Sequence, residues 1–437
     1  MKECQGFESY LSEITLPRFY KARQHFDPAC IQREEISVVV KEELERIRLS
    51  AKIFPGMRIA VTAGSRGIAN IDQIILAIVD YLKALQAEPF IIPAMGSHGG
   101  GTAEGQRGLL QEYGITEETM GCPLISSMEV TRIGVTKDGR DVYIDQAAAS
   151  ADGIVVVGRI KPHTGFRGPF QSGLMKMMAI GLGKQYGARV CHEEGFQRMG
   201  YNVEVFGTAV LQNSPVLCGV GILENAFDKT WKIAALDKEE IIAKEPGLLK
   251  EAEAHMPRIL LPECDVLIVD EIGKNFSGDG MDPNVTGTFA TPYASGGIRA
   301  ERVCVLDLSP ESHGNGMGSG MASAITKRVF DQLDLTTMYL NGFTCRNLNG
   351  SRIPCIMQSD KDAIRFCLGT CVNADPENPR IIRIFNSQFV EYLWISEALA
   401  KNLPEGMELL GEAEEFIFDE KGELQGKEPR QRGKRRF

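Results

Sequence analysis

The 437-residue sequence lacks several features that would assign it to a special class of protein. No run approaches the ~18 apolar residues of a membrane span, and the charged N-terminal stretch has no apolar core of a signal peptide. The eleven cysteines are scattered and form no CxxC pair, so we expect reduced thiols and neither a disulfide framework nor a structural zinc site. These absences predict a cytoplasmic protein with no membrane partner.

Positive charge is also scarce, since the net charge is −10 and the body of the chain has no basic stripe with interleaved aromatics. This charge distribution argues against a protein that binds nucleic acid. The one basic cluster, at residues 427–437, is typical of a solvated tail. A hydrophobic content of 43% and a charged content of 24% are ordinary for a globular protein.

The usual signatures of metal and phosphate sites are missing as well. There are only six histidines and no HExxH motif, so a hydrolytic zinc site is not favoured. The loop GSHGGGT at residues 96–102 lacks both the GK[ST] ending of a P-loop and the GxGxxG spacing of a dinucleotide site. Its glycines can still offer backbone N–H groups to an anion.

The sequence does contain short buried strands followed by helices, which is the pattern of an α/β protein. In the first half of the chain these strands are expected at residues 58–64, 90–95, 152–158 and 215–223. The first three end in polar, Gly-rich loops that carry Arg66, His98 and His163. Ligands of open α/β sheets bind beyond the carboxyl ends of the strands. These loops would therefore share one site if their strands are parallel and adjacent.

The chain is longer than a domain with a single hydrophobic core usually is. We therefore expect two α/β domains with a cofactor and substrate cleft between them. Residues 1–260 are predicted to form the catalytic and cofactor-binding domain. Residues 261–426 are predicted to form a second domain that closes the substrate site, and residues 427–437 a basic tail.

An unusual lysine occurs in the run GLMKMMAIGLGKQYGARVCH at residues 173–192. Such a lysine usually packs its stem and extends its ammonium to water. It can also be a nucleophile or a point of covalent attachment. Lys176 shares this half of the chain with His98, His163 and His192, and several histidines near Gly-rich loops favour a site over isolated loop contacts. Two of them would make an acid/base pair, since imidazole titrates near neutral pH.

Four elements, in order, resemble the nickel-pincer-dependent lactate racemase family of 2-hydroxyacid racemases and epimerases. They are SRG at residues 65–67, GSHGGGTAEGQ at 96–106, PHTGFRG at 162–168, and a lysine followed sixteen residues later by a histidine. The resemblance covers the first domain almost entirely and the second only in general layout.

The resemblance implies a cofactor and a role for each residue of the site. Lys176 would be covalently attached to the pyridinium-3-thioamide-5-thiocarboxylic acid mononucleotide, which other proteins make, and His192 would ligate its nickel. His98 and His163 would be the acid/base pair that serves transfer of the C2 hydrogen as hydride, and Arg66 would orient the substrate carboxylate. The protein would then be an isomerase that inverts C2 of a 2-hydroxy acid.

Departures from the family pattern indicate a substrate other than lactate. Ala63 and Gly64 stand where the family commonly has an acidic pair, and Ser65 replaces a threonine. In the second domain KNFSGDGMDPNVTG stands where a glutamine and a lysine close the lactate site. We expect a larger or more polar hydroxy acid, such as a sugar acid. Candidate residues for its contacts are Asp282, Asn284 and Thr286.

Two alternatives remain open from the sequence. The first is a metallohydrolase or lyase that binds zinc or iron through His98, His163 and His192, with Lys176 as an electrostatic neighbour. The second is a non-catalytic protein that binds an anion or a nucleotide through the GSHGGGT loop.

Overall fold

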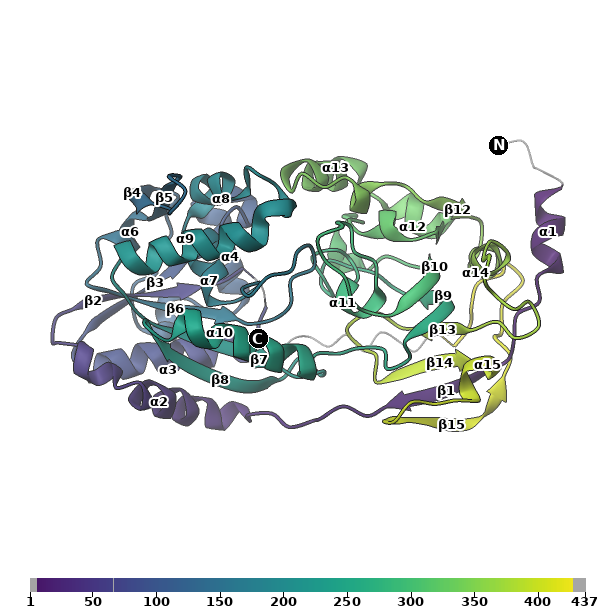
Figure 1. Ribbon diagram of the computed structural model, residues 1–437, viewed down its shortest axis with the longest axis horizontal. Coiled ribbons are helices and arrows are strands. Elements are labelled where there is room, and N and C mark those ends of the chain that lie inside the picture. Colours follow the sequence, from purple (N-terminus) through teal and green to yellow (C-terminus); the bar gives the residue numbers. More distant parts are fainter. Residues whose placement is uncertain (1–5, 66, 427–437) are drawn as a thin grey trace. The chain divides into compact units, whose positions relative to one another are not determined.

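The computed structural model describes residues 6–65 and 67–426, and these form two compact units. One unit contains residues 28–256, and the other contains residues 6–27 together with residues 257–426. Each unit is built of helices around its own sheet, which confirms the predicted α/β class (Figure 1). Over the described ranges, none of the helices has the length and apolar character that a membrane crossing requires.

A five-stranded sheet forms the centre of the unit of residues 28–256, with the strand order β3-β2-β6-β7-β8. The first four strands are parallel, and β8 is antiparallel to β7. The strands are β2 (Arg58–Ala63), β3 (Glu88–Pro93), β6 (Gly153–Arg159), β7 (Val216–Glu224) and β8 (Thr230–Asp237), and a separate hairpin contains β4 (Val130–Val135) and β5 (Asp141–Asp145). The four predicted strands of this half are therefore confirmed, with ends shifted by a few residues.

The strand order reverses once in this sheet. The chain adds β3 on one side of β2 and later adds β6 on the other side, so the reversal point lies between β2 and β6. In open α/β sheets a crevice forms at such a point, beyond the carboxyl ends of the strands.

Helices cover both faces of this sheet (Figure 1). They are α2 (Ile36–Arg46), α3 (Ile71–Ala84), α4 (Ala103–Glu112), α5 (Glu117–Met120), α6 (Gln146–Ala149), α7 (Leu174–Lys176), α8 (Lys184–His192), α9 (Met199–Asn213) and α10 (Ile241–His255). Alternate residues of each strand face opposite layers: Val61 packs with α2 and α3, whereas Ala60 belongs to the cluster that contains α7 and α9. Strands buried on both faces need the near-continuous apolar runs that this sequence has.

The unit of residues 6–27 and 257–426 has an eight-stranded sheet in the order β12-β11-β10-β9-β13-β14-β1-β15. Its strands are β1 (Phe19–Gln24), β9 (Glu263–Val269), β10 (Arg299–Val305), β11 (Ala324–Thr326), β12 (Cys355–Met357), β13 (Ile381–Ile384), β14 (Tyr392–Ser396) and β15 (Met407–Glu414). Its helices are α1 (Phe7–Glu13), α11 (Pro283–Thr286), α12 (Lys327–Gln332), α13 (Leu335–Thr344), α14 (Asp360–Gly369) and α15 (Glu397–Ala400). The strands from β12 to β13 are parallel, and the last three are antiparallel additions.

The division of the chain differs from the predicted domain of residues 1–260 at its N-terminal end. Strand β1 pairs with both β14 and β15, so residues 6–27 belong to the unit of residues 257–426. Pairing over such a separation leaves no local signal in the sequence, which is why the interpretation assigned this segment to its sequence neighbours. The predicted basic tail, residues 427–437, lies outside the described residues.

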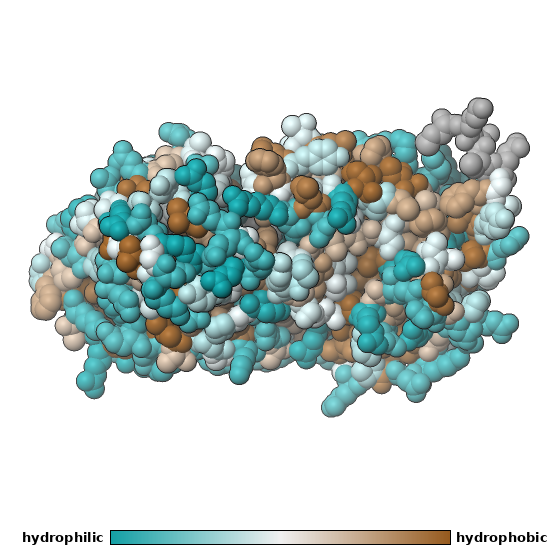
Figure 2. All heavy atoms as spheres, turned by 45° about the horizontal axis from the view of Figure 1, so that its top comes forward, coloured by the Kyte–Doolittle hydropathy of each residue, from teal (hydrophilic) through white to brown (hydrophobic). Residues whose placement is uncertain are grey.

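Hydrophobic side chains form small groups on the largely hydrophilic face that Figure 2 shows. Among the large apolar side chains that the structure exposes, Tyr339, Leu340 and Phe343 share helix α13. Scattered groups of this size are ordinary on protein surfaces.

A buried ion pair joins strand β13 of the larger sheet to Asp270, the residue that follows β9. Arg383 of β13 donates from Nε and Nη2 to the carboxylate of Asp270, at 2.8 Å for each of the two closest contacts. The Arg383 guanidinium also lies 4.4 Å from the ring centroid of Trp394. Because both charges are buried, loss of one partner leaves the other uncompensated.

We therefore expect Arg383→Met to lower the free energy of unfolding by about 3–5 kcal/mol in urea titrations. The double variant Arg383→Met/Asp270→Leu should recover most of this loss. Arg299→Met is the control, because the Arg299 side chain is 82% exposed in its pair with Glu263 and should contribute at most about 1 kcal/mol. Equal losses in the two single variants would contradict the assignment.

Candidate active site

Met177 lies over the strand ends at the reversal point. A Cβ atom added to Gly158 of β6 would stand 2.7 Å from Met177 Cγ, and one added to Gly64, after β2, would stand 3.5 Å from Met177 Cε. At the first distance, any larger residue in place of Gly158 would force the Met177 side chain to move. Lys176 therefore belongs to a segment that crosses the carboxyl ends of β2 and β6, where a ligand of this fold class is expected.

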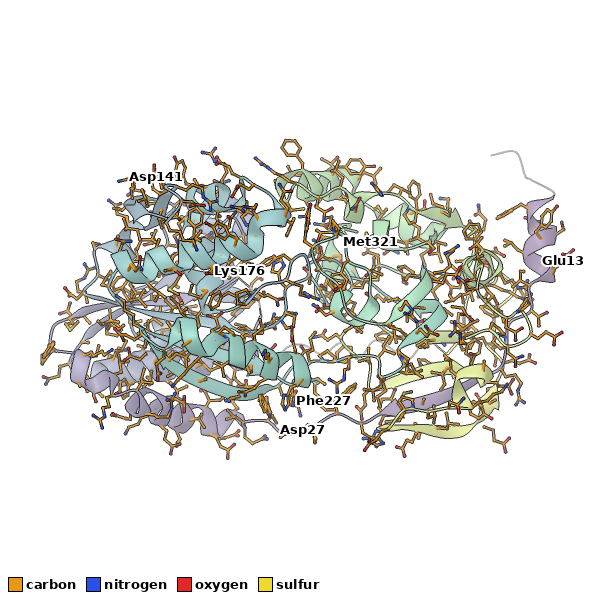
Figure 3. All side chains as sticks on the ribbon, in the orientation of Figure 1. Glu13, Asp27, Asp141, Lys176, Phe227 and Met321 are labelled. Carbon is orange, nitrogen blue, oxygen red and sulfur yellow. The ribbon has the colours of Figure 1, made fainter. Side chains whose placement is uncertain are left out.

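The backbone changes its helical form immediately after Lys176, which Figure 3 labels on α7. Residues Met177–Gly181 form a π-helix, and α8 follows and ends at His192. A π-helix is rare and frequently marks a functional site. The segment also contacts the end of β3, because Gly96 N donates to Gly181 O at 3.2 Å.

A buried carboxylate holds the beginning of this segment. Glu245 of α10 accepts a hydrogen bond from Met175 N at 3.0 Å, and a Cβ atom on Gly173 would stand 2.1 Å from Glu245 Oε1. Burial raises the pKa of Glu245 to about 8, against smaller opposing effects of the backbone N–H groups of Met175 and Leu174. Glu245 is therefore largely protonated at neutral pH, and Gly173 is required for its close approach.

His163 lies in a loop that is closed at its base. Lys161 and Ser172 exchange backbone hydrogen bonds of 3.0 and 3.1 Å, and the side-chain oxygen of Gln171 accepts from His163 N at 2.9 Å. Gly165 N donates to His163 Nδ1 at 3.0 Å. Because Nδ1 accepts this bond, the neutral ring carries its proton on Nε2.

The surroundings of His163 favour this neutral form. The pKa of the His163 imidazole lies well below its usual range, first because the ring is desolvated and next because of the charges of Lys176 and His192. Lys161 and Arg167 lower the pKa further. Lys176 and His192 thus act on the His163 ring through their charges.

His98 has a different arrangement of partners. Its Nδ1 lies 2.9 Å from Met95 O and 2.8 Å from Ser65 Oγ, and Tyr113 Oη donates to Ser65 O at 2.8 Å. A carbonyl oxygen can only accept, so Nδ1 of His98 donates and Nε2 carries the lone pair. In their neutral forms His98 thus offers a proton acceptor at Nε2, and His163 offers a donor.

The loops that carry the two histidines follow strands on either side of β2. The structure thus has the adjacent, parallel strands that the sequence interpretation required for a shared site. Neighbouring strands lie about 4.8 Å apart, so the ends of β3 and β6 are separated by about 10 Å.

The remaining predicted residues are placed as follows. Arg66 lies outside the described residues. Asp282, Asn284 and Thr286 belong to the other unit, where Asp282 Oδ1 accepts from Asn284 N at 3.0 Å at the start of α11. Thr286 Oγ1 donates to Asp282 O at 3.1 Å, so these polar atoms contribute to the local structure of α11.

Sequence reasoning missed four buried polar residues that support the site: Gln106, Gln171, Lys184 and Glu245. Lys184 had a detectable signal, since it lies in the same glycine-studded apolar run as Lys176. Gln106 is the last residue of the GSHGGGTAEGQ element, but nothing in the sequence indicated its contacts. Gln171 and Glu245 had no signal, because their partners are backbone atoms of other residues in the unit.

No three histidine, cysteine or carboxylate side chains come together as a metal-binding group within the described part of the chain. The alternative of a metal held by His98, His163 and His192 together therefore receives no support from this arrangement.

Comparison with known proteins gives a match over part of the chain. Residues 8–199 match the family model described as the lactate racemase N-terminal domain. No curated protein matches the chain. Among solved structures, the chain is similar to the lactate racemase apoprotein from Thermoanaerobacterium thermosaccharolyticum, at 14% identity and a TM-score of 0.43, with 70% of each chain covered.

Glu245 generates a prediction about stability. Its folded-state pKa of about 8 exceeds its ordinary value of 4.5, so the folded protein binds more protons than the unfolded chain between these values. The free energy of unfolding should therefore fall as pH rises from about 4.5 to about 8, by up to roughly 5 kcal/mol from this one group.

Glu245→Gln keeps an oxygen for Met175 N and removes the titration. Urea unfolding from pH 5 to pH 9 should show a growing advantage of the variant over the wild type as pH rises. Parallel stability curves for the two proteins would contradict the raised pKa.

Proposed function

We propose that the protein is a racemase or epimerase that inverts C2 of a 2-hydroxy acid, because residues 8–199 match the family model of the lactate racemase N-terminal domain. The observation that carries the proposal is the position of His98 and His163 after strands on either side of β2. The charge of Lys176 also acts on the His163 ring. Two imidazoles on either side of a substrate can serve the two faces of one carbon.

The residues whose charges act on His163 include the lysine and the histidine that the family's cofactor would need. We propose that Lys176 is attached to the pyridinium mononucleotide and that His192 ligates its nickel, since imidazole is a suitable donor for this ion. The electrostatic effect of both side chains on one imidazole supports the fit. When bound, the nickel-pincer group, which other proteins make, supplies a reversible acceptor for the C2 hydrogen as hydride.

The chain's own residues then bind the substrate and move protons. His98 takes the hydroxyl proton at Nε2, and His163 donates a hydrogen bond from Nε2 to the oxygen at C2, as a neutral imidazole can. For the opposite isomer the roles are exchanged: the ring proton of His163 first moves to Nδ1, which breaks the hydrogen bond from Gly165 N, and His163 Nε2 then takes the hydroxyl proton. His98, protonated at Nε2, donates a proton in return. Arg66 holds the substrate carboxylate through its planar guanidinium.

We propose that the substrate is larger or more polar than lactate, such as a sugar acid. Asp282, Asn284 and Thr286 remain proposed contacts for its additional hydroxyl groups. Their loop, which replaces the residues that close the lactate site, supports this part of the proposal.

His98→Ala and His163→Ala should each reduce inversion of C2 by at least ~100-fold, because each removes a proton donor or acceptor. Each replacement should stop inversion from both isomers, since every turnover needs both histidines. The measurement is C2 inversion or hydrogen exchange across a panel of 2-hydroxy acids with nickel-loaded protein.

His255→Gln is the matched control from the same unit, because His255 stacks on Trp231 with ring centroids 3.6 Å apart and should leave the rate unchanged. Unimpaired turnover of either isomer by a single His98 or His163 variant would refute the acid/base assignment. An anion-binding protein without catalysis would bind equally well with either histidine replaced.

A further inference from the structure

Lys184 is a fully buried lysine that the proposed reaction does not use. Its side chain and that of Asp145 have 0% exposure, and Nζ lies 3.0 Å from Asp145 Oδ2. Nζ also donates to Pro93 O at 2.6 Å. Burying an ammonium group is costly without such partners. The two contacts therefore fix the Nζ atom between β3 and the end of β5.

The backbone at Lys184 adopts φ +52°, a left-handed conformation that a residue with a side chain rarely takes. Strain of this kind persists where the surroundings hold the residue in place. Here the buried side chain at the first residue of α8 provides that restraint.

The partners of Lys184 lead directly to the His98 loop. Pro93 is the last residue of β3, from which this loop departs. Gln106 Oε1 lies 3.5 Å from Lys184 Nζ, and Gln106 Nε2 donates to Gly96 O at 3.0 Å and to His98 O at 3.2 Å. One buried ammonium group thus connects α8 with both ends of the loop that carries His98.

We propose that Lys184 is a positioning residue that holds the His98 loop against α8, the helix that ends at His192. The inference rests on the proposed function, in which His98 is a base and His192 a nickel ligand. Lys184 itself touches neither substrate nor cofactor. Its role is to keep the His98 imidazole at a fixed place relative to that helix, and a displacement of about 1 Å can cost about 100-fold in rate.

Two sets of variants separate positioning from general stability. Lys184→Met/Asp145→Asn removes both buried charges and keeps an oxygen for Ala148 N, which Asp145 Oδ1 binds at 3.0 Å. Gln106→Leu removes the amide bridge to the loop and leaves the Lys184–Asp145 pair intact. The control is Lys52→Met, which breaks a 2.5 Å pair with Asp237. Asp237 lies in β8, the edge strand on the other side of the sheet from β3, and is the backbone register partner of Cys218 in β7.

The first readout is hydrogen exchange in the protein without cofactor. In both sets we expect backbone amides of residues 94–101 to exchange at least about tenfold faster, whereas those of β7 keep wild-type rates. Lys52→Met should leave residues 94–101 unchanged. Wild-type exchange of this loop in both sets would overturn the proposal, and so would equal acceleration throughout the unit.

The second readout is turnover of the loaded protein. We expect kcat to fall by about 100-fold with KM nearly unchanged, because the loop places a proton acceptor and does not bind the carboxylate. Wild-type kcat in both sets would contradict the positioning role. If the wild type inverts no 2-hydroxy acid, the proposed function fails, and the exchange experiment still decides whether Lys184 holds the loop.

Discussion

The reversal of strand order between β2 and β6 is the constraint on which the candidate site depends. It places the loops after β3, β2 and β6 side by side at one edge of a parallel sheet. Gly64 and Gly158 have no side chains at this edge, so the segment that contains Met177 can cross the strand ends. Lys176 and His192 both come from this crossing segment and its continuation. The sheet topology thus brings together residues more than ninety positions apart in the sequence.

Buried polar groups then hold these elements in place. Glu245 fixes the start of the crossing segment, Gln171 braces the His163 loop, and Lys184 connects α8 to the His98 loop. Hydrogen bonds also set the ring tautomers, since Nδ1 of His98 donates to a carbonyl and Nδ1 of His163 accepts from an amide. The chemistry open to the two histidines is therefore determined by their backbone partners.

Local patterns in the sequence were sufficient to predict the strands of the first half and the loops that follow them. Apolar runs of strand length with β-branched residues are strong signals for buried parallel strands. The candidate residues on those loops could be chosen for the same reason, since a strand end is a local feature, and their roles stay predictions. Lys184 and Glu245 were missed as contributors because buried polar networks depend on tertiary neighbours. The unit to which β1 belongs could not be predicted from local patterns either, because its partners β14 and β15 lie far along the chain.

The most direct test of the account is the intact mass of the protein from a host that makes the nickel-pincer nucleotide. The account predicts a mass increase from covalent attachment at Lys176, and no increase in Lys176→Ala. Wild-type protein that inverts a 2-hydroxy acid while its mass remains unmodified would contradict the central claim.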